Sequence, residues 1–503
     1  TENWFDLNAS RYTPSSTLQR MELLKTGYMG TLSLGWDNYL FLELTGRQER
    51  SSTLKDQSFF YPSANLSFLF TQAFHMPSWW NYGKLRLSYG IVGNAPETYT
   101  ANIVYEQGSD NGFTWNTIPS SWGNADIHPE KKYEYEIGLE SKFLNNRLGI
   151  DISYYYNRVK DQILSTPQPS TSGVKNVLMN VGEVANRGWD ISISATPILT
   201  RDFRWDLTAN YGVYKNKVVK LADGVPYLEI LNSGGSGIKI QAVEGQPMGD
   251  IYAQVPQVNE NGEYLVSDKG LYLNQTELQK VGNINPAGVG GLFNSFSYKN
   301  VFLDFSIDFR IGGDVINEMN QYATAVGLTP ESLKYRDTEH GGLSYYYPGD
   351  NNSSGIPVQV DPSTGAGPNG EIIYHDGIIL PGVVASTGER NTRIIPAGYY
   401  YNTTYNWGTE AEQLTYRHSV FDNSYVKLRE LTIGYQFPEK MISKLGLGRL
   451  SVSVFGRNLF YFYKALKNYD AESSVGTSWA NQATVGSSTT ATRSFGVSLR
   501  ASF

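Results

Sequence analysis

The sequence predicts an all-β chain that forms part of a transmembrane antiparallel β-barrel. Three observations lead to this prediction. Apolar and polar residues alternate with a period of two along the whole chain. The connections between the alternating segments are short and long in turn, and aromatic residues gather at the segment ends. The 36 Tyr, 22 Phe, 10 Trp and 50 Gly agree, because aromatic residues suit pleated strands and glycine suits turns.

Thirteen segments show this alternation. Each is about ten residues long, which is enough to cross a bilayer at a tilt. In the clearest segment Val301, Leu303 and Phe305 share one face, and Asp304 and Asp308 lie on the other. The predicted strands cover 28–36, 40–44, 64–70, 85–91, 133–139, 148–156, 189–195, 205–213, 291–298, 301–311, 431–437, 450–454 and 495–503.

The connections distinguish a membrane barrel from a soluble β-sandwich, since alternation alone is common to both. Short turns fall at 37–38, 145–146 and 299–300. Every long connection falls on the opposite end of the sheet, which is typical of short periplasmic turns and long extracellular loops. The predicted outer loops cover about 93–131, 158–186, 215–289, 313–424 and 460–491.

Composition and motifs exclude several function classes. The absence of cysteine rules out disulfides and thiolate metal sites. A net charge of −7 argues against nucleic-acid binding, and no run of 18 apolar residues predicts a transmembrane helix. The five histidines have no metal-protease spacing, and neither a GxSxG elbow nor a P-loop occurs, so no enzyme is predicted.

Several stretches carry a family resemblance. They include KLRLSYGIVGN (84–94), YEYEIGLESKFLNNRLGIDISYYYNRVKDQIL (133–164), NVGEVANRGWDISI (180–193), FSYKNVFLDFSIDFRIGGDVIN (296–317) and SYVKLRELTIGYQFP (424–438). Together they resemble the C-terminal part of the SusC/RagA family of TonB-dependent outer-membrane transporters. The similar stretches run through nearly the whole chain in the family's order, which makes the resemblance specific.

The resemblance implies a barrel in the outer membrane of a Gram-negative bacterium that imports a bulky nutrient. Family substrates are oligosaccharides for many members and peptides for others, and the aromatic loops favour an oligosaccharide here. The implied partners are a SusD-like surface lipoprotein acting as a lid, the TonB–ExbB–ExbD complex acting through a plug, the barrel-assembly machinery and outer-membrane lipids. A dimer of transporter–lid pairs is a further expectation, and no nucleic acid is expected.

The resemblance covers only the barrel portion, so residues 1–503 are expected to form the C-terminal part of a longer barrel. Thirteen strands fall short of the 22 of plugged transporters, and a plug domain is absent from this sequence. Open sheet edges cannot be satisfied in lipid, so further strands are expected from residues outside the chain. Two alternatives stay open: a passive porin-like channel, and a soluble β-rich glycan-binding or adhesion protein.

Aromatic residues in the outer loops are the candidate substrate contacts, because a sugar presents an apolar ring face to a flat side chain. The alternative for each of them is to pack the long loops together or against the lid. Trp79 and Trp80 are excluded, since they fall on the periplasmic side as interface anchors. The candidates are Trp115, Trp122, Tyr345, Tyr346, Tyr347, Trp407 and Trp479.

Two further features concern the chain's end and a possible ion. The terminal strand ends on Phe503, which resembles a barrel-assembly signal and is equally compatible with a last lipid-facing residue. The stretch 257–268 partly fits a calcium loop, but it begins with Gln257 and has no flanking helices. A hairpin tip at Asn261 and Gly262 is the better prediction, and no cofactor or metal is expected.

Overall fold

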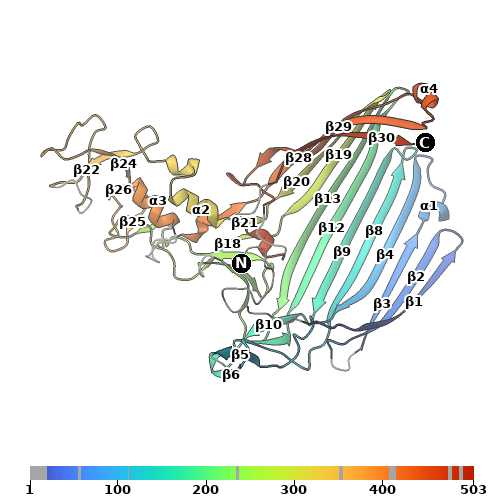
Figure 1. Ribbon diagram of the computed structural model, residues 1–503, viewed down its shortest axis with the longest axis horizontal. Helices are drawn as coiled ribbons and strands as arrows, with labels where there is room; N and C mark the ends of the chain where they lie inside the picture. Colours follow the sequence, from blue (N-terminus) through green and yellow to red (C-terminus); the bar gives the residue numbers. More distant parts are fainter. Residues whose placement is uncertain are drawn as a thin grey trace, which may run out of the picture.

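The computed structural model describes residues 20–54, 58–110, 113–233, 237–349, 355–406, 415–473, 478–486 and 491–502. These residues form one large curved sheet, here called the wall, and an outer body built from the long connections at one end of it (Figure 1). No helix within these ranges has the length and apolar character needed to cross a membrane.

The wall contains thirteen strands, each paired antiparallel with its neighbours in sequence order. Every predicted segment coincides with one strand, which confirms the thirteen-strand prediction. The strands are β1 (Lys25–Trp36), β2 (Leu40–Ser51), β3 (Ser58–Phe68), β4 (Trp80–Asn94), β8 (Glu130–Phe143), β9 (Leu148–Lys160), β12 (Glu183–Leu199), β13 (Phe203–Lys220), β19 (Gly288–Tyr298), β20 (Val301–Ile311), β28 (Tyr425–Gln436), β29 (Arg449–Lys464) and β30 (Ser494–Ser502).

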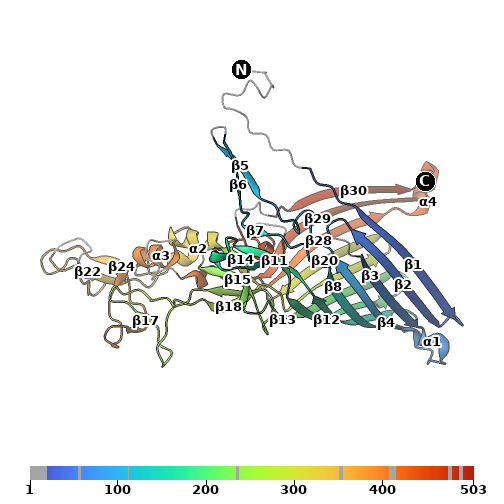
Figure 2. The same cartoon turned by 90° about the horizontal axis from the view of Figure 1, so that it is seen from below.

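The two ends of the wall differ, as the connection lengths predict. The turn between β1 and β2 contains Asp37 and Asn38 at the left-handed φ values of 49° and 58°, and the Tyr39 N–H closes it by donating to the Trp36 carbonyl at 3.2 Å. The same end carries the short helices α1 (Phe70–Ala73) and α4 (Glu439–Ile442), followed by the single turn η6 (Ser443–Leu445). Figure 2 shows the wall curving into a trough, with β12 and β13 at its base.

The apolar faces of the wall strands are exposed on the convex side. Leu34, Ile137, Trp189 and Val497 are 52, 47, 47 and 70% exposed, although each belongs to an alternating apolar row. The buried apolar clusters lie instead at the outer end of the wall and in the outer body. A soluble sandwich would bury these rows against a second sheet, so the convex face matches a lipid-facing surface.

The outer body consists of short strands, two short helices and several 3-10 turns. Its strands are β5 (Glu106–Asp110), β6 (Phe113–Thr117), β7 (Ser121–Trp122), β10 (Ile163–Pro167), β11 (Asn176–Asn180), β14 (Tyr227–Ser233), β15 (Ile238–Val243), β16 (Asp250–Ala253), β17 (Leu265–Val266), β18 (Gln279–Asn283), β21 (Asp314–Ile316), β22 (Leu343–Tyr346), β23 (Val358–Gln359), β24 (Tyr374–Ile378), β25 (Val383–Val384), β26 (Ile395–Pro396) and β27 (Val420–Asp422). Its helices are α2 (Glu318–Ala325) and α3 (Ala397–Tyr405), and its single 3-10 turns are η2 (Ser170–Ser172), η4 (Pro330–Leu333), η5 (Tyr416–Ser419) and η7 (Asn481–Ala483).

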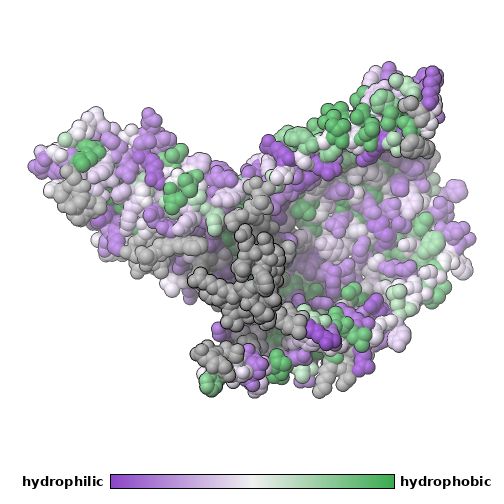
Figure 3. Space-filling model, viewed as in Figure 1, coloured by the Kyte–Doolittle hydropathy of each residue, from purple (hydrophilic) through white to green (hydrophobic). Residues whose placement is uncertain are grey.

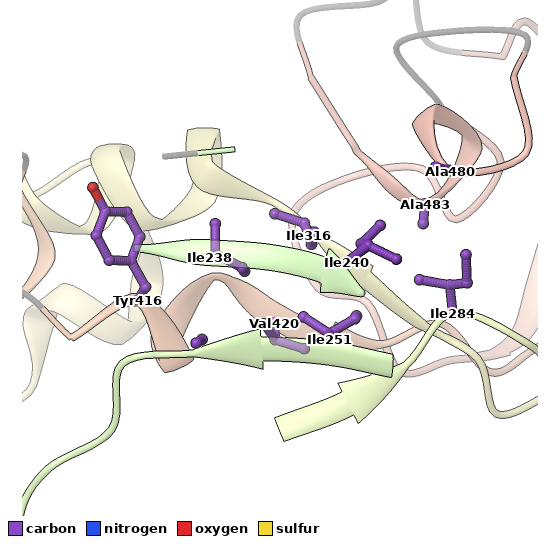
Figure 4. Packing of buried hydrophobic residues seen from close by; sticks show 10 residues of the cluster. Ile238, Ile240, Ile251, Ile284, Ile316, Tyr416, Val420, Ala480 and Ala483 are labelled. Carbon is purple, nitrogen blue, oxygen red and sulfur yellow. The ribbon is translucent and has the colours of Figure 1, made fainter. Parts of the chain in front are cut away.

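One apolar core joins three of the long connections. Ile240 and Ile251 come from β15 and β16, Ile316 from β21 and Val420 from β27, and Ala483 comes from the last connection (Figure 4). Full burial of an isoleucine contributes roughly 1.5–3 kcal/mol, so convergence of these side chains can hold the loops as one folded unit. The connections after β13, β20 and β29 therefore fold together.

Helices α2 and α3 were not predicted, since every predicted element is a strand or a loop. Both are short, and tertiary contacts stabilise them more than helix propensity does. The side chain of Asn317 caps α2 by accepting a hydrogen bond from the Asn320 N–H at 2.9 Å. A second difference is at β3, which ends at Phe68, so that Phe70 begins α1 instead of extending the strand.

Candidate functional site

The concave face of the wall encloses a polar hollow. A cavity of about 750 Å³ lies against β4, β9, β12, β13 and β20. Its lining includes Arg86, Asp151, Asp190, Asp308 and Arg310, the polar residues that alternate with the apolar convex rows. Figure 3 looks into this hollow, and the part visible to the right of the grey atoms shows hydrophilic residues mixed with hydrophobic ones. The face opposite the lipid-facing rows is thus suited to contact a polar solute.

An ion-pair network fixes the charges at the β4 side of the hollow. Arg86 donates to Asp151 at 2.6 Å and to the Ser153 hydroxyl at 3.2 Å. Lys84 pairs with Glu140 of the neighbouring β8 at 2.8 Å. Lys84 and Glu140 lie opposite each other on adjacent strands, whereas Arg86 reaches Asp151 and Ser153 of β9 across Gly138 of β8, which has no side chain to block it.

A second network ties the last long connection to the wall. The strand pairing shifts register around Arg429, and this bulge puts Lys427 opposite Asp308. Arg429 bonds the Glu472 carboxylate through both terminal nitrogens, at 2.9 and 2.6 Å, and pairs with Asp308. Lys427 is 1% exposed and contacts both Glu472 and the ring of Tyr461, 4.7 Å from its centroid. These contacts hold the connection after β29 against the inside of the wall.

A larger cavity, of about 960 Å³, lies where the outer ends of β9, β12 and β13 meet the outer body. Its lining includes the basic residues Arg158, Arg187, Lys215, Lys217 and Lys280. Sequence reasoning missed this concentration of positive charge, because the five residues are spread over more than a hundred positions. Four of them, Arg158, Arg187, Lys215 and Lys217, become neighbours through the pairing of β9, β12 and β13.

Two of the predicted substrate-contact residues lie near the rim. Trp115 is 46% exposed in β6, with its indole packed over Gly108 of the paired β5. Figure 2 shows this hairpin standing away from the other loops. Trp122 in β7 is half-buried and meets Tyr105 edge to face at 6.3 Å. Both rings could accept a ligand, so their role stays a prediction.

The tyrosine triplet is mostly inside the outer body. Tyr345 is 1% and Tyr347 is 5% exposed, and the Tyr345 ring stacks on Tyr374 at 5.5 Å. The Tyr345 hydroxyl donates to Asp376 at 3.1 Å, and burial raises the pKa of that phenol. Tyr346 is half-buried. These side chains pack the loop, so a ligand would reach Tyr345 and Tyr347 only after the body opens.

Of the three remaining predicted residues, the structure describes only Trp479. Trp479 is 37% exposed, and its ring packs against Gly249, where an added Cβ would come within 2.9 Å. Trp407 and Phe503 lie outside the described residues. Among the candidates that the structure describes, no ring contact joins Trp115, Trp122 and Trp479.

The stretch considered for calcium forms the predicted hairpin. Val258 pairs with Tyr264, and Gly262 at φ 81° sits at the tip. The Asn259 side-chain oxygen accepts hydrogen bonds from the backbone N–H groups of Asn261 and Glu263, at 3.0 and 2.9 Å. Throughout the part of the chain that the structure describes, no three His, Asp or Glu side chains gather as a metal site.

Exposed apolar residues on the helices of the outer body were not predicted. Tyr322 on α2 and Tyr399 on α3 are exposed, as are Leu328 and Leu333 in the connection between these helices. Exposed apolar groups in a folded body commonly mark a contact surface for another protein. The residues are too scattered in the sequence for a periodic signal to reveal them.

Comparisons with known proteins agree with the fold. Residues 3–256 match the family model described as TonB dependent receptor-like, beta-barrel. TonB-dependent receptor P3 of Formosa agariphila is 24% identical over 494 residues, covering 89% of this chain and 42% of the relative. TonB-dependent receptor SusC of Bacteroides thetaiotaomicron is 30% identical over 247 residues, covering 45% of this chain and 24% of the relative.

The similar solved structures include the RagAB peptide importer in its open-open state. That chain superposes with a TM-score of 0.69 at 18% identity, covering 100% of this chain and 50% of its own length. This likeness concerns the fold alone. The chain spans less than half the length of the curated relatives it matches.

Proposed function

This chain belongs to the TonB-dependent receptor-like β-barrel family, and from that premise we propose that it forms the wall and outer loops of an active nutrient importer. Members of the family are outer-membrane β-barrels and are not enzymes. The observation that carries the proposal is the pairing of exposed convex apolar rows with a polar concave hollow beneath a folded outer body. Lipid on one side and a transported solute on the other would require this division.

Active import needs an energy input. We propose that TonB acts through a plug outside these residues, and that further strands outside them close the wall. A passive porin-like channel shares the wall but needs no coupling. Uptake measured with and without TonB in the native host distinguishes the two: import falls to background without TonB, whereas a passive channel continues to conduct.

A surface lipoprotein of the SusD type is the proposed lid. The exposed apolar residues of α2, α3 and the connection between them support this partner, because they stay uncovered in the folded outer body. Purification of the full-length transporter in mild detergent should recover a lipoprotein, identified by mass spectrometry. Replacing Leu328 and Leu333 by Ser should reduce that recovery, while recovery of the transporter itself stays unchanged.

The proposed substrate is an oligosaccharide. Exposed rings at the rim, such as Trp115 on the β5–β6 hairpin, support this class because sugars stack on flat aromatic faces. Titration calorimetry with panels of oligosaccharides and of peptides tests the choice. Binding of sugars that weakens in Trp115→Ala supports an oligosaccharide, and binding confined to peptides contradicts it.

A further inference from the structure

A group of basic side chains occupies the convex face of the wall near its outer end. Arg187 of β12 lies opposite Lys215 of β13 in the register, and one pleat further out Ala185 lies between Arg158 of β9 and Lys217 of β13. We call Arg158, Arg187, Lys215 and Lys217 the basic cluster. Since side chains two positions apart share a face, all four point to the same side of the sheet.

That side is the lipid-facing one. Going from the cluster toward the membrane, the next row in the register is Tyr154, Trp189 and Val213, and the rings of Tyr154 and Trp189 lie 4.8 Å apart. Trp189 continues the exposed apolar row of the convex face. Aromatic residues in this position sit at the level of the lipid head groups. The basic cluster therefore begins where the hydrocarbon of the outer leaflet ends.

Most of the cluster's charge has no protein partner. Arg158 pairs with Glu183, but within the described residues Arg187, Lys215 and Lys217 have neither an ion pair nor a side-chain hydrogen bond, and all three are exposed. The four residues line the cavity of about 960 Å³ together with Tyr156. Its two acidic residues are Asp250, which is fully buried and pairs with Lys280 at 2.7 Å, and Asp314, which accepts a hydrogen bond from the Asn283 N–H at 2.9 Å. Five basic residues line the same cavity. The cavity thus offers a net positive lining beside an aromatic row.

We propose that the basic cluster binds the phosphate groups of a phosphorylated outer-leaflet lipid. Arginine and lysine are the side chains that recognise phosphate, the arginine by paired N–H donors and the lysine as a point charge. The lipid's acyl chains would lie on Trp189 and Val213 while its head group reaches the cluster. An anionic solute in the concave hollow would be on the opposite face of the sheet, so a lipid is the ligand that this position selects.

The full-length transporter in detergent provides the test. Lipid A carrying its phosphates, dephosphorylated lipid A and inorganic phosphate are titrated separately and counted as bound molecules by native mass spectrometry. We expect the phosphorylated lipid to bind at least tenfold more tightly than the other two, since both the charged contacts and the apolar row are needed. Equal binding of the dephosphorylated lipid would overturn the proposal.

Variants separate this site from non-specific attraction. The double variant Arg187→Gln, Lys215→Gln should bind the phosphorylated lipid about tenfold more weakly than the wild type does. Its affinity for the dephosphorylated lipid should be unchanged. Lys440→Gln with Lys444→Gln removes the same charge from the opposite rim and should have no effect. Lys215→Arg should retain binding, and heat-dependent migration on gels confirms that each barrel is folded. Loss of affinity in both double variants alike would contradict a specific site.

Discussion

At the scale of single residues, the buried charge of Lys427 explains how a loop is held to the wall. Its ammonium group is almost fully enclosed, so the Glu472 carboxylate is needed to balance it. Burial alone would raise the pKa of Glu472, but hydrogen bonds from Arg429 and Lys427 lower it below its usual range. The carboxylate therefore stays charged at neutral pH.

Glu472→Gln should release this loop. The substitution leaves Lys427 buried without a counter-charge and should reduce local stability by about 2 kcal/mol. Hydrogen exchange of residues 465–473 measures the effect, with faster exchange expected in the variant. Glu22→Gln is the matched control, because Glu22 also pairs with an arginine but both partners are exposed. Equal exchange rates in the wild type and in Glu472→Gln would show that the network does not hold the loop.

His418 gives the outer body a pH dependence. Its ring stacks on Tyr405 at 4.4 Å, and burial, with Arg417 nearby, lowers its pKa to about 4. The unfolded histidine takes up a proton below about 6.5, whereas the folded one resists it. Stability of the outer body should therefore be full above pH 6.5 and fall by up to about 3 kcal/mol as the pH drops to 4.

Limited proteolysis of the purified transporter at pH 7 and pH 4.5 checks this dependence. Cleavage within the outer body should accelerate at the lower pH in the wild type. His418→Phe keeps a ring on Tyr405 without a titrating group, so the pH effect should shrink in that variant. A variant that retains the whole acceleration would assign it to other groups.

At the scale of elements, close strand packing depends on a glycine in β19. A Cβ on Gly290 would lie 2.4 Å from the Asn210 carbonyl oxygen and equally close to the Phe309 ring. The missing side chain lets Phe309 and Tyr211 stack across β19, with ring centroids 6.2 Å apart. The ring contact that Gly290 permits joins β13 to β20 across β19, and we call this contact the seam.

Gly290→Ala should weaken that seam. The methyl group must displace backbone or ring atoms, which costs about 1–3 kcal/mol. Urea unfolding of the full-length barrel in liposomes should show a lower midpoint. Gly30→Ala in β1 is the control, because an added Cβ there meets nothing within 4 Å. The same shift in both variants would attribute the effect to glycine's backbone freedom instead of to the contact.

At the scale of the whole molecule, the sheet order leaves β1 and β30 as its two edges. Each edge presents unpaired backbone groups, which cannot be satisfied by lipid. Residues 1–503 expressed alone should therefore fail to insert into liposomes as a heat-modifiable barrel. Refolding with the full-length protein as the control measures this, and an inserted, protease-resistant wall from residues 1–503 would contradict the expected need for further strands.

The sequence determined the strands of the wall and the direction in which they face. Alternation with a period of two is a local property, and it fixes which residues meet lipid without knowledge of distant contacts. The left-handed turn at Asp37 and Asn38 is also local, since short hairpins depend on a few residues. The lengths of the connections distinguished the short-turn end of the wall from the long-loop end, because these lengths can also be read without knowledge of distant contacts.

Only the tertiary structure decided the organisation of the outer body and of the sites. Tyr345 and Trp115 are both loop aromatics in the sequence, yet one is buried and the other is exposed, because long-range packing selects between them. The helices α2 and α3 form for the same reason. The basic cluster required the register of three strands, as Arg158, Arg187 and Lys215 become neighbours only when the sheet is paired.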